Sequence, residues 1–139
     1  MMSAGLHSAP LPAVSPASWA AALTLHLPAA RTAPAIARHA VGAVLAQWGH
    51  SEDVALVVSE LVTNSVEYGA PPIVLRVLRR EGRVHISVFD SSPVPPCWRT
   101  PRLDEEGGRG LLVVAAVATT YGYRRTGAGK ATWATLSVP

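Results

Sequence analysis

The sequence lacks most of the features that mark secreted, membrane-spanning or nucleic-acid-binding proteins. Its single cysteine, Cys97, allows no internal disulfide, so we expect a cytoplasmic protein. No run of about 18 apolar residues occurs, so no membrane association is predicted. The first 18 residues contain no Lys or Arg, so no secretory signal is predicted either. The net charge is only +3 and the basic residues are scattered, which argues against direct nucleic-acid binding.

What the sequence does contain is enough apolar material for a core. Apolar residues make up 49% of the 139 residues, which is typical of one globular domain. Residues 1–18 hold Pro10, Pro12 and Pro16 without any periodicity, so we expect a flexible leader there. Residues 19–139 are predicted to form the domain.

Hydrophobic periodicity predicts an alternation of strands and helices after this leader. Apolar residues at every second position indicate a strand, and apolar residues that recur every three to four positions indicate a helix. The predicted strands are 19–27, 73–80, 83–90, 121–125 and 130–138, and the predicted helices are 34–49, 51–69 and 110–120. This order predicts an α+β two-layer sandwich, in which a mixed, mostly antiparallel sheet has three helices on one face.

Glu60 and Asn64 are the first candidate site residues. They are four positions apart in the predicted helix 51–69, so they stack on one face at the border of its apolar side. A carboxylate and an amide held half-buried together suggest the edge of a polar pocket, or ligands for a hard cation such as Mg²⁺. The alternative is that Glu60 is solvated and Asn64 belongs to the helix end.

Asp90 is the second candidate. It continues the row of Val84, Ile86 and Val88 on one face of its strand, so it is predicted to be buried. A buried carboxylate needs hydrogen-bond donors or a ligand. The alternative is that Asp90 caps the turn at Ser91-Ser92.

Two further segments fit a ligand site. Residues 91–106 contain four prolines and no period, which is typical of a functional loop such as a lid, although a plain surface loop is the alternative. The run Gly107-Gly108-Arg109-Gly110 opens an apolar helix. Glycines there allow the backbone to approach a phosphate, while an ordinary hinge is the alternative.

Together these motifs resemble the nucleotide pocket of the GHKL ATPase superfamily. The pattern is Glu60-x-x-x-Asn64, then Asp90, then Gly107-x-x-Gly110, and its most specific part is the run SELVTNSVEYG. Within the superfamily, the chain looks like the small anti-sigma regulatory factors and their serine-kinase relatives. The resemblance covers roughly residues 19–138 and implies the Bergerat fold, in which ATP lies between the helices and a lid.

The resemblance also implies a role for each matching residue. Asn64 would ligate a Mg²⁺ that bridges the phosphates, and Glu60 would act as general base. Asp90 would accept a hydrogen bond from the adenine amino group. Gly108, Arg109 and Gly110 would contact the phosphates. The chain departs from the family pattern at Ser91-Ser92-Pro93, where glycines are common, at Lys130, where threonine is common, and at Tyr68, where histidine is common.

Two functions therefore compete. The first is a bacterial anti-sigma factor that uses Mg²⁺ and ATP to phosphorylate an anti-sigma antagonist on serine or threonine and that sequesters a sigma factor, with homodimer formation possible. The second is a non-catalytic nucleotide- or partner-binding module with the same fold. A free-standing histidine kinase is disfavoured, because no helix pair presents a phospho-acceptor histidine.

Overall fold

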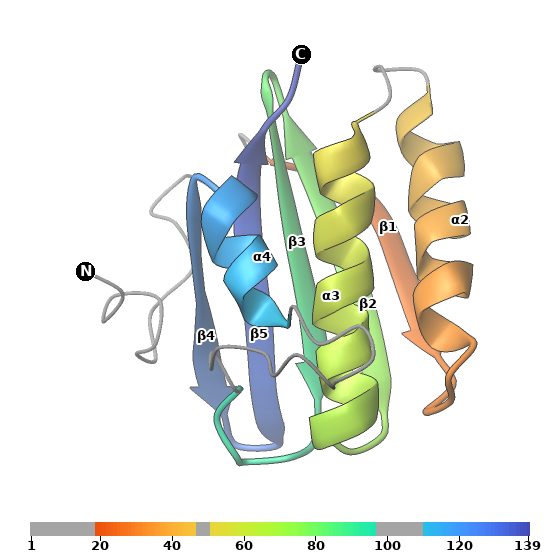
Figure 1. Ribbon diagram of the computed structural model, residues 1–139, viewed down its shortest axis with the longest axis vertical. Coiled ribbons are helices and arrows are strands. Elements are labelled where there is room, and N and C mark those ends of the chain that lie inside the picture. Colours follow the sequence, from red (N-terminus) through yellow and green to blue (C-terminus); the bar gives the residue numbers. More distant parts are fainter. Residues whose placement is uncertain (1–18, 47–50, 97–109) are drawn as a thin grey trace.

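A computed structural model describes residues 19–46, 51–96 and 110–139. Within these residues, five strands form one sheet and three helices cover one of its faces (Figure 1). The order across the sheet is β1-β2-β3-β5-β4, and every one of these pairings is antiparallel. The predicted α+β sandwich is confirmed, and no parallel pair contributes to the described sheet. The strands are β1 (Ala20–Leu27), β2 (Ile73–Arg80), β3 (Arg83–Asp90), β4 (Thr120–Thr126) and β5 (Gly129–Ser137).

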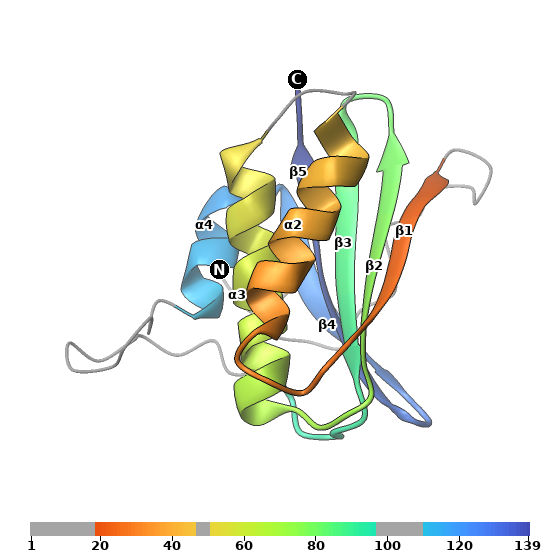
Figure 2. The same ribbon diagram turned by 90° about the vertical axis from the view of Figure 1, so that its right-hand side faces the viewer.

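The helices begin and end close to the predicted residues, and the side view shows them as one layer (Figure 2). The helices are α2 (Ala33–Leu45), α3 (Glu52–Tyr68) and α4 (Leu111–Val117). At the start of α3, Ser51 Oγ accepts a hydrogen bond from the backbone nitrogen of Val54 at 3.3 Å. Gly69 ends the same helix, as its sequence position predicts.

One predicted helix end differs from the structure, and another lies outside the described residues. Helix α4 ends at Val117, before the predicted Thr120, because the backbone nitrogen of Thr119 already donates to Thr135 of β5 at 2.8 Å. Gly49, the predicted end of the α2 segment, lies outside the described residues. So do the expected leader at 1–18, the part of the expected lid from Cys97 onward, and Gly107, Gly108 and Arg109.

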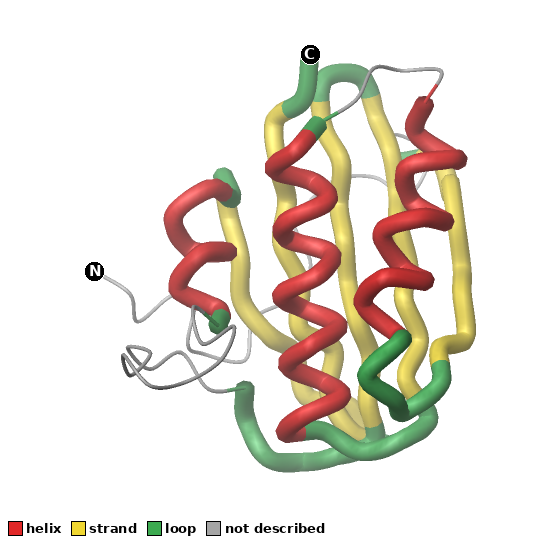
Figure 3. Tube along the Cα trace, turned by 45° about the vertical axis from the view of Figure 1, so that its right-hand side comes forward, coloured by secondary structure: helices red, strands yellow, loops and turns green. Residues whose placement is uncertain are grey.

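The core lies between the helix layer and the sheet. Helix α3 runs across the middle of the sheet (Figure 3) and buries one apolar stripe against it. Each fully buried Val or Leu stabilises the fold by about 1.5–3 kcal/mol relative to exposure. The buried stripe consists of Val54, Val57, Val58, Leu61 and Val62, and the sheet presents Leu75, Val77, Ile86, Val88 and Ala134.

The register between β3 and β5 positions the candidate site. Val84 pairs with Leu136 and Ile86 with Ala134, and all four side chains are buried in the core. The same register places Asp90 opposite Lys130 at the end of β3. Both side chains therefore lie on the helix-facing side of the sheet. None of the described helices is long and apolar enough to cross a membrane.

Candidate functional site

Glu60 and Asn64 lie in the C-terminal half of α3, one turn apart. The Asn64 side chain is only 6% exposed, and it has no hydrogen-bond partner among the described residues. Glu60 is half-buried and has interactions with its surroundings. A nearly buried amide normally has a partner in the protein, water or a ligand. The structure therefore places Asn64 at the edge of the core, as the helical pattern predicts.

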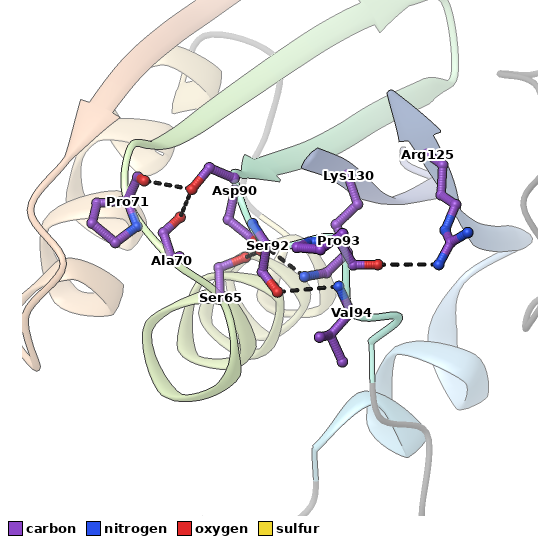
Figure 4. Close-up of polar contacts among 10 residues, drawn as sticks. Ser65, Ala70, Pro71, Asp90, Ser92, Pro93, Val94, Arg125 and Lys130 are labelled. Carbon is purple, nitrogen blue, oxygen red and sulfur yellow. Dashed lines mark hydrogen bonds and ion pairs between the residues drawn. The ribbon is translucent and has the colours of Figure 1, made fainter. Parts of the chain in front are cut away.

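Asp90 ends β3 and its side chain is fully buried, which confirms the predicted row. Its carboxylate accepts three hydrogen bonds (Figure 4). Oδ1 accepts from Lys130 Nζ at 2.9 Å and from the backbone nitrogen of Ser92 at 3.0 Å. Oδ2 accepts from Ser65 Oγ at 2.8 Å. Asp90 therefore caps the turn through Ser92 and also accepts hydrogen bonds from the buried Ser65 and Lys130 side chains. The predicted buried carboxylate with donors and the predicted turn cap are both observed.

Lys130 is a site residue that sequence analysis missed. It was noted only as a departure from the family pattern, yet its ammonium forms an ion pair with Asp90, and both side chains are buried. The signal that could have found it is the strand register. Lys130 precedes Thr132, Ala134 and Leu136 at a period of two, so it belongs to the same inward-facing row.

Ser65 connects this ion pair to the helix that carries the other candidates. It follows Asn64 directly in α3, and its hydroxyl reaches the Asp90 carboxylate. Gly69 allows this close packing, because a Cβ atom there would lie 2.5 Å from Cγ of Asp90. The C-terminal turn of α3 therefore packs directly on the end of β3. Asn64, Asp90 and Lys130 belong to one connected region.

Hydrogen bonds hold residues 91–94, the segment directly after β3, against neighbouring parts of the chain. Ser91 Oγ donates to the carbonyl oxygen of Pro71 at 2.6 Å, and Arg125 Nη2 donates to that of Pro93 at 3.3 Å (Figure 4). The backbone nitrogen of Val94 donates to Ser92 Oγ at 3.1 Å. The first residues of the expected lid are thus held beside the ion pair.

Of the expected phosphate-contacting residues, only Gly110 is described. It directly precedes α4 with a φ of 55°, a conformation that favours glycine. No group of three or more His, Cys, Asp or Glu side chains that could hold a metal occurs among the described residues. A metal at Asn64 would therefore take most of its ligands from a bound molecule and water, as Mg²⁺ often does.

A second buried polar residue, His85, lies away from this site on the sheet face that the helices do not cover. Its register partner is Thr135, and His85 Nδ1 lies 2.9 Å from Thr135 Oγ1. Trp133 packs beside the His85 ring, with ring centroids 5.6 Å apart. Burial, with the nearby charges of Arg124 and Arg76, lowers the pKa of His85 to about 4. This residue was not singled out by sequence analysis, because a histidine in an alternating strand reads as solvated.

Comparison with known proteins defines the family. The family model of the histidine kinase-like ATPase domain matches residues 26–136. The chain belongs to this family. Its fold is also similar to the crystal structure of the RsbU and RsbW domains of Rv1364c from Mycobacterium tuberculosis, with a TM-score of 0.61 and 23% sequence identity. That match covers 83% of this chain but only 31% of the other, so it shows the fold alone. No curated protein matches the chain.

A histidine kinase-like ATPase domain implies nucleotide binding, usually with Mg²⁺, and the described residues fit such a ligand in two respects. Asn64 offers a nearly buried amide with no protein partner in the described region. Asp90 Oδ2 accepts only one hydrogen bond there, and a carboxylate oxygen can accept two. Lys130 differs from the family pattern and changes the surroundings of the carboxylate that would contact the base.

Proposed function

We propose that the chain is an ATP-binding regulatory protein that resembles anti-sigma factors. In this proposal it is a Mg-ATP-dependent serine/threonine kinase that phosphorylates an anti-sigma antagonist and sequesters a sigma factor, in the cytoplasm. Residues 19–139 form the nucleotide-binding domain. The proposal rests above all on Asn64, which is nearly buried without a described partner, one turn from Glu60 and next to the residue that contacts Asp90.

Each site residue has a distinct task in this proposal. Asn64 holds Mg²⁺ through its amide oxygen, and Asp90 accepts a hydrogen bond from the adenine amino group. Gly108, Arg109 and Gly110 contact the phosphates. When bound, Mg²⁺ offsets the negative charge that the phosphates carry.

Glu60 acts as the general base. Its carboxylate accepts the proton of a serine or threonine hydroxyl on the antagonist, while that oxygen bonds to the terminal phosphorus of ATP and ADP leaves. A half-buried glutamate suits this role, because partial burial restricts the side chain without removing it fully from the surface. The proton ends on Glu60 and the phosphoryl group on the antagonist, so atoms and charges balance.

A second candidate function is a non-catalytic module that binds its partner through the same fold. The ion pair between Lys130 and Asp90 supports this alternative, because the ammonium occupies one oxygen, Oδ1, of the carboxylate that would contact the base. The module would hold a sigma factor or another regulator, with or without nucleotide, and would transfer no phosphate.

Calorimetry of the unaltered chain with ATP tests the proposal first. We expect binding in the presence of Mg²⁺ and markedly weaker binding in EDTA. If no heat is detected in either condition at millimolar ATP, the nucleotide function is wrong. Incubation with labelled ATP and a candidate antagonist, beside a pull-down with a sigma factor, then separates the two functions. A protein that retains the sigma factor but labels no antagonist is the binding module.

A further inference from the structure

The buried ion pair has unused hydrogen-bonding capacity. Lys130 Nζ donates to Asp90 Oδ1 at 2.9 Å, and this is its only partner in the described part of the chain. An ammonium has three N–H groups, so two of them have no acceptor among the described residues. The side chain of Lys130 is 2% exposed, which leaves little room for solvent to satisfy them. A buried charged group with unfilled donors is unfavourable unless a further acceptor is supplied.

The carboxylate of Asp90, in turn, can accept a further hydrogen bond. Two donors reach Oδ1, whereas Oδ2 accepts only from Ser65 within the described residues. Within the part of the chain that the structure describes, the pair therefore offers one free acceptor position and free donors side by side, on neighbouring strands β3 and β5. Adenine has the matching pattern, because its amino group donates and the ring nitrogens on either side of it, N1 and N7, accept.

We propose that Lys130 is a specificity-determining residue of the nucleotide site, whose ammonium donates a hydrogen bond to a ring nitrogen beside the adenine amino group. This inference rests on the proposed nucleotide function. Asp90 then accepts from the amino group while Lys130 supplies the neighbouring donor. Adenine is then recognised through its amino group and a neighbouring ring nitrogen, and not through the amino group alone. The ion pair holds both groups in position before the base arrives, which reduces the ordering that binding requires.

A purely structural ion pair predicts a different result. If Lys130 only joins β5 to β3, the ring nitrogens of the base make no contact with it. Replacing either nitrogen by carbon would then leave the affinity unchanged. The two interpretations can therefore be separated by altering the ligand, which leaves the folding of the protein untouched.

The experiment is calorimetry of the unaltered chain with Mg²⁺ and ATP, 1-deaza-ATP or 7-deaza-ATP. We expect one analogue to bind about 10- to 100-fold more weakly than ATP, as the loss of one charged hydrogen bond requires, and the other to bind like ATP. The weaker analogue identifies the contacted nitrogen as N1 or N7. If both analogues bind as ATP does, Lys130 does not read the base and the inference is wrong, although the nucleotide function stands. If ATP itself does not bind, the nucleotide function fails and this inference fails with it.

A variant assigns any loss to Lys130. Lys130→Met keeps the length of the side chain but removes its donors, so the discrimination between ATP and the weaker analogue should vanish. Far-UV CD and a thermal melt establish that the variant is folded, since it leaves Asp90 without its counter-ion. If the folded variant still discriminates, another residue contacts the nitrogen and the inference is wrong. If it does not fold, Lys130→Arg, which keeps the charge but changes the donor geometry, should alter the ratio of the two affinities, and an unchanged ratio overturns the inference.

Discussion

Ser65 Oγ donates a 2.8 Å hydrogen bond to Asp90 Oδ2, and both side chains are buried. This contact connects the helix that carries Asn64 and Glu60 to the strand that ends in Asp90. The two parts of the candidate site are 25 residues apart in sequence and are held together at this point. The contact should therefore support both the stability of the fold and the position of the carboxylate.

Ser65→Ala should lower the free energy of unfolding by about 1–3 kcal/mol, because it removes a donor from a buried carboxylate. Urea denaturation measures the change. Ser59→Ala is the matched control on the same helix. Ser59 Oγ donates to the carbonyl oxygen of Ala55 and accepts from the exposed Arg38 Nη1 at 3.0 Å, and we expect a smaller effect there because neither bond involves a buried charge. If both variants lose the same free energy of unfolding, the hydrogen bond to Asp90 contributes no more to stability than the bonds of Ser59.

Asn64→Ala should abolish the magnesium-dependent part of ATP binding, because it removes the proposed metal ligand. The far-UV CD spectrum should stay unchanged, since alanine favours helices. Calorimetry with Mg²⁺ and with EDTA measures the dependence. Thr63→Ala, at the adjacent half-buried position, is the control and should bind like the parent. Equal binding by the Asn64 variant and the parent would disprove the metal role.

Glu60→Gln should reduce phosphoryl transfer by about 10²–10⁴-fold, the usual effect of removing one positioned base. ATP affinity and partner capture should change little, because the base acts on the acceptor in the transition state. Glu67→Gln is the control, since Glu67 lies on the same helix but is exposed. Turnover by the Glu60 variant at the parental rate would exclude Glu60 as the base.

Asp90 should select adenine over guanine. Guanine presents a carbonyl oxygen where adenine presents its amino group, and this oxygen would face the carboxylate. In a competition assay on the unaltered chain, we expect GTP to displace bound ATP at least about 10-fold less effectively than ATP does, the usual weight of one hydrogen bond to a charged group. Displacement on equal terms would show that Asp90 does not read this position of the base.

His85 should make the fold less stable in mild acid. Its pKa is lowered to about 4 in the folded state from 6.5, so the unfolded chain takes up the proton first as the pH falls. Stability is then lost progressively between pH 6.5 and 4, by about 3 kcal/mol in total. Urea denaturation across this range should show the loss, and His85→Gln, which cannot titrate, should show a smaller one. An identical pH profile for both proteins would contradict this assignment.

The sequence predicted those features that depend on local periodicity. The strands Ile73–Arg80 and Arg83–Asp90 and the capped helix from Glu52 to Tyr68 all occur as expected, because their apolar residues recur at a single period. The burial of Asp90 followed from the same pattern. The family resemblance predicted the sandwich and the histidine kinase-like ATPase domain.

The missed features depend on contacts between distant segments. The partner of Asp90 is 40 residues away, and only the register of β3 with β5 brings Lys130 opposite to it. The burial of His85 likewise depends on Trp133 from another strand. Nothing in the local sequence of either residue fixes these pairings, so Lys130 was noted only as a departure from the family pattern and His85 was not singled out.

The strand order of the sheet has a consequence for the way the site is assembled during folding. Among the described strands, β5 comes last in chain order, yet it lies between β3 and β4 and contributes Lys130 to the carboxylate of Asp90. A nascent chain that has emerged only as far as β4 can pair β2 with β3. It still lacks β5, the strand that lies between β3 and β4. The ion pair between Asp90 and Lys130 therefore cannot form until β5 has been synthesised, and a shorter nascent chain does not yet present the complete candidate site.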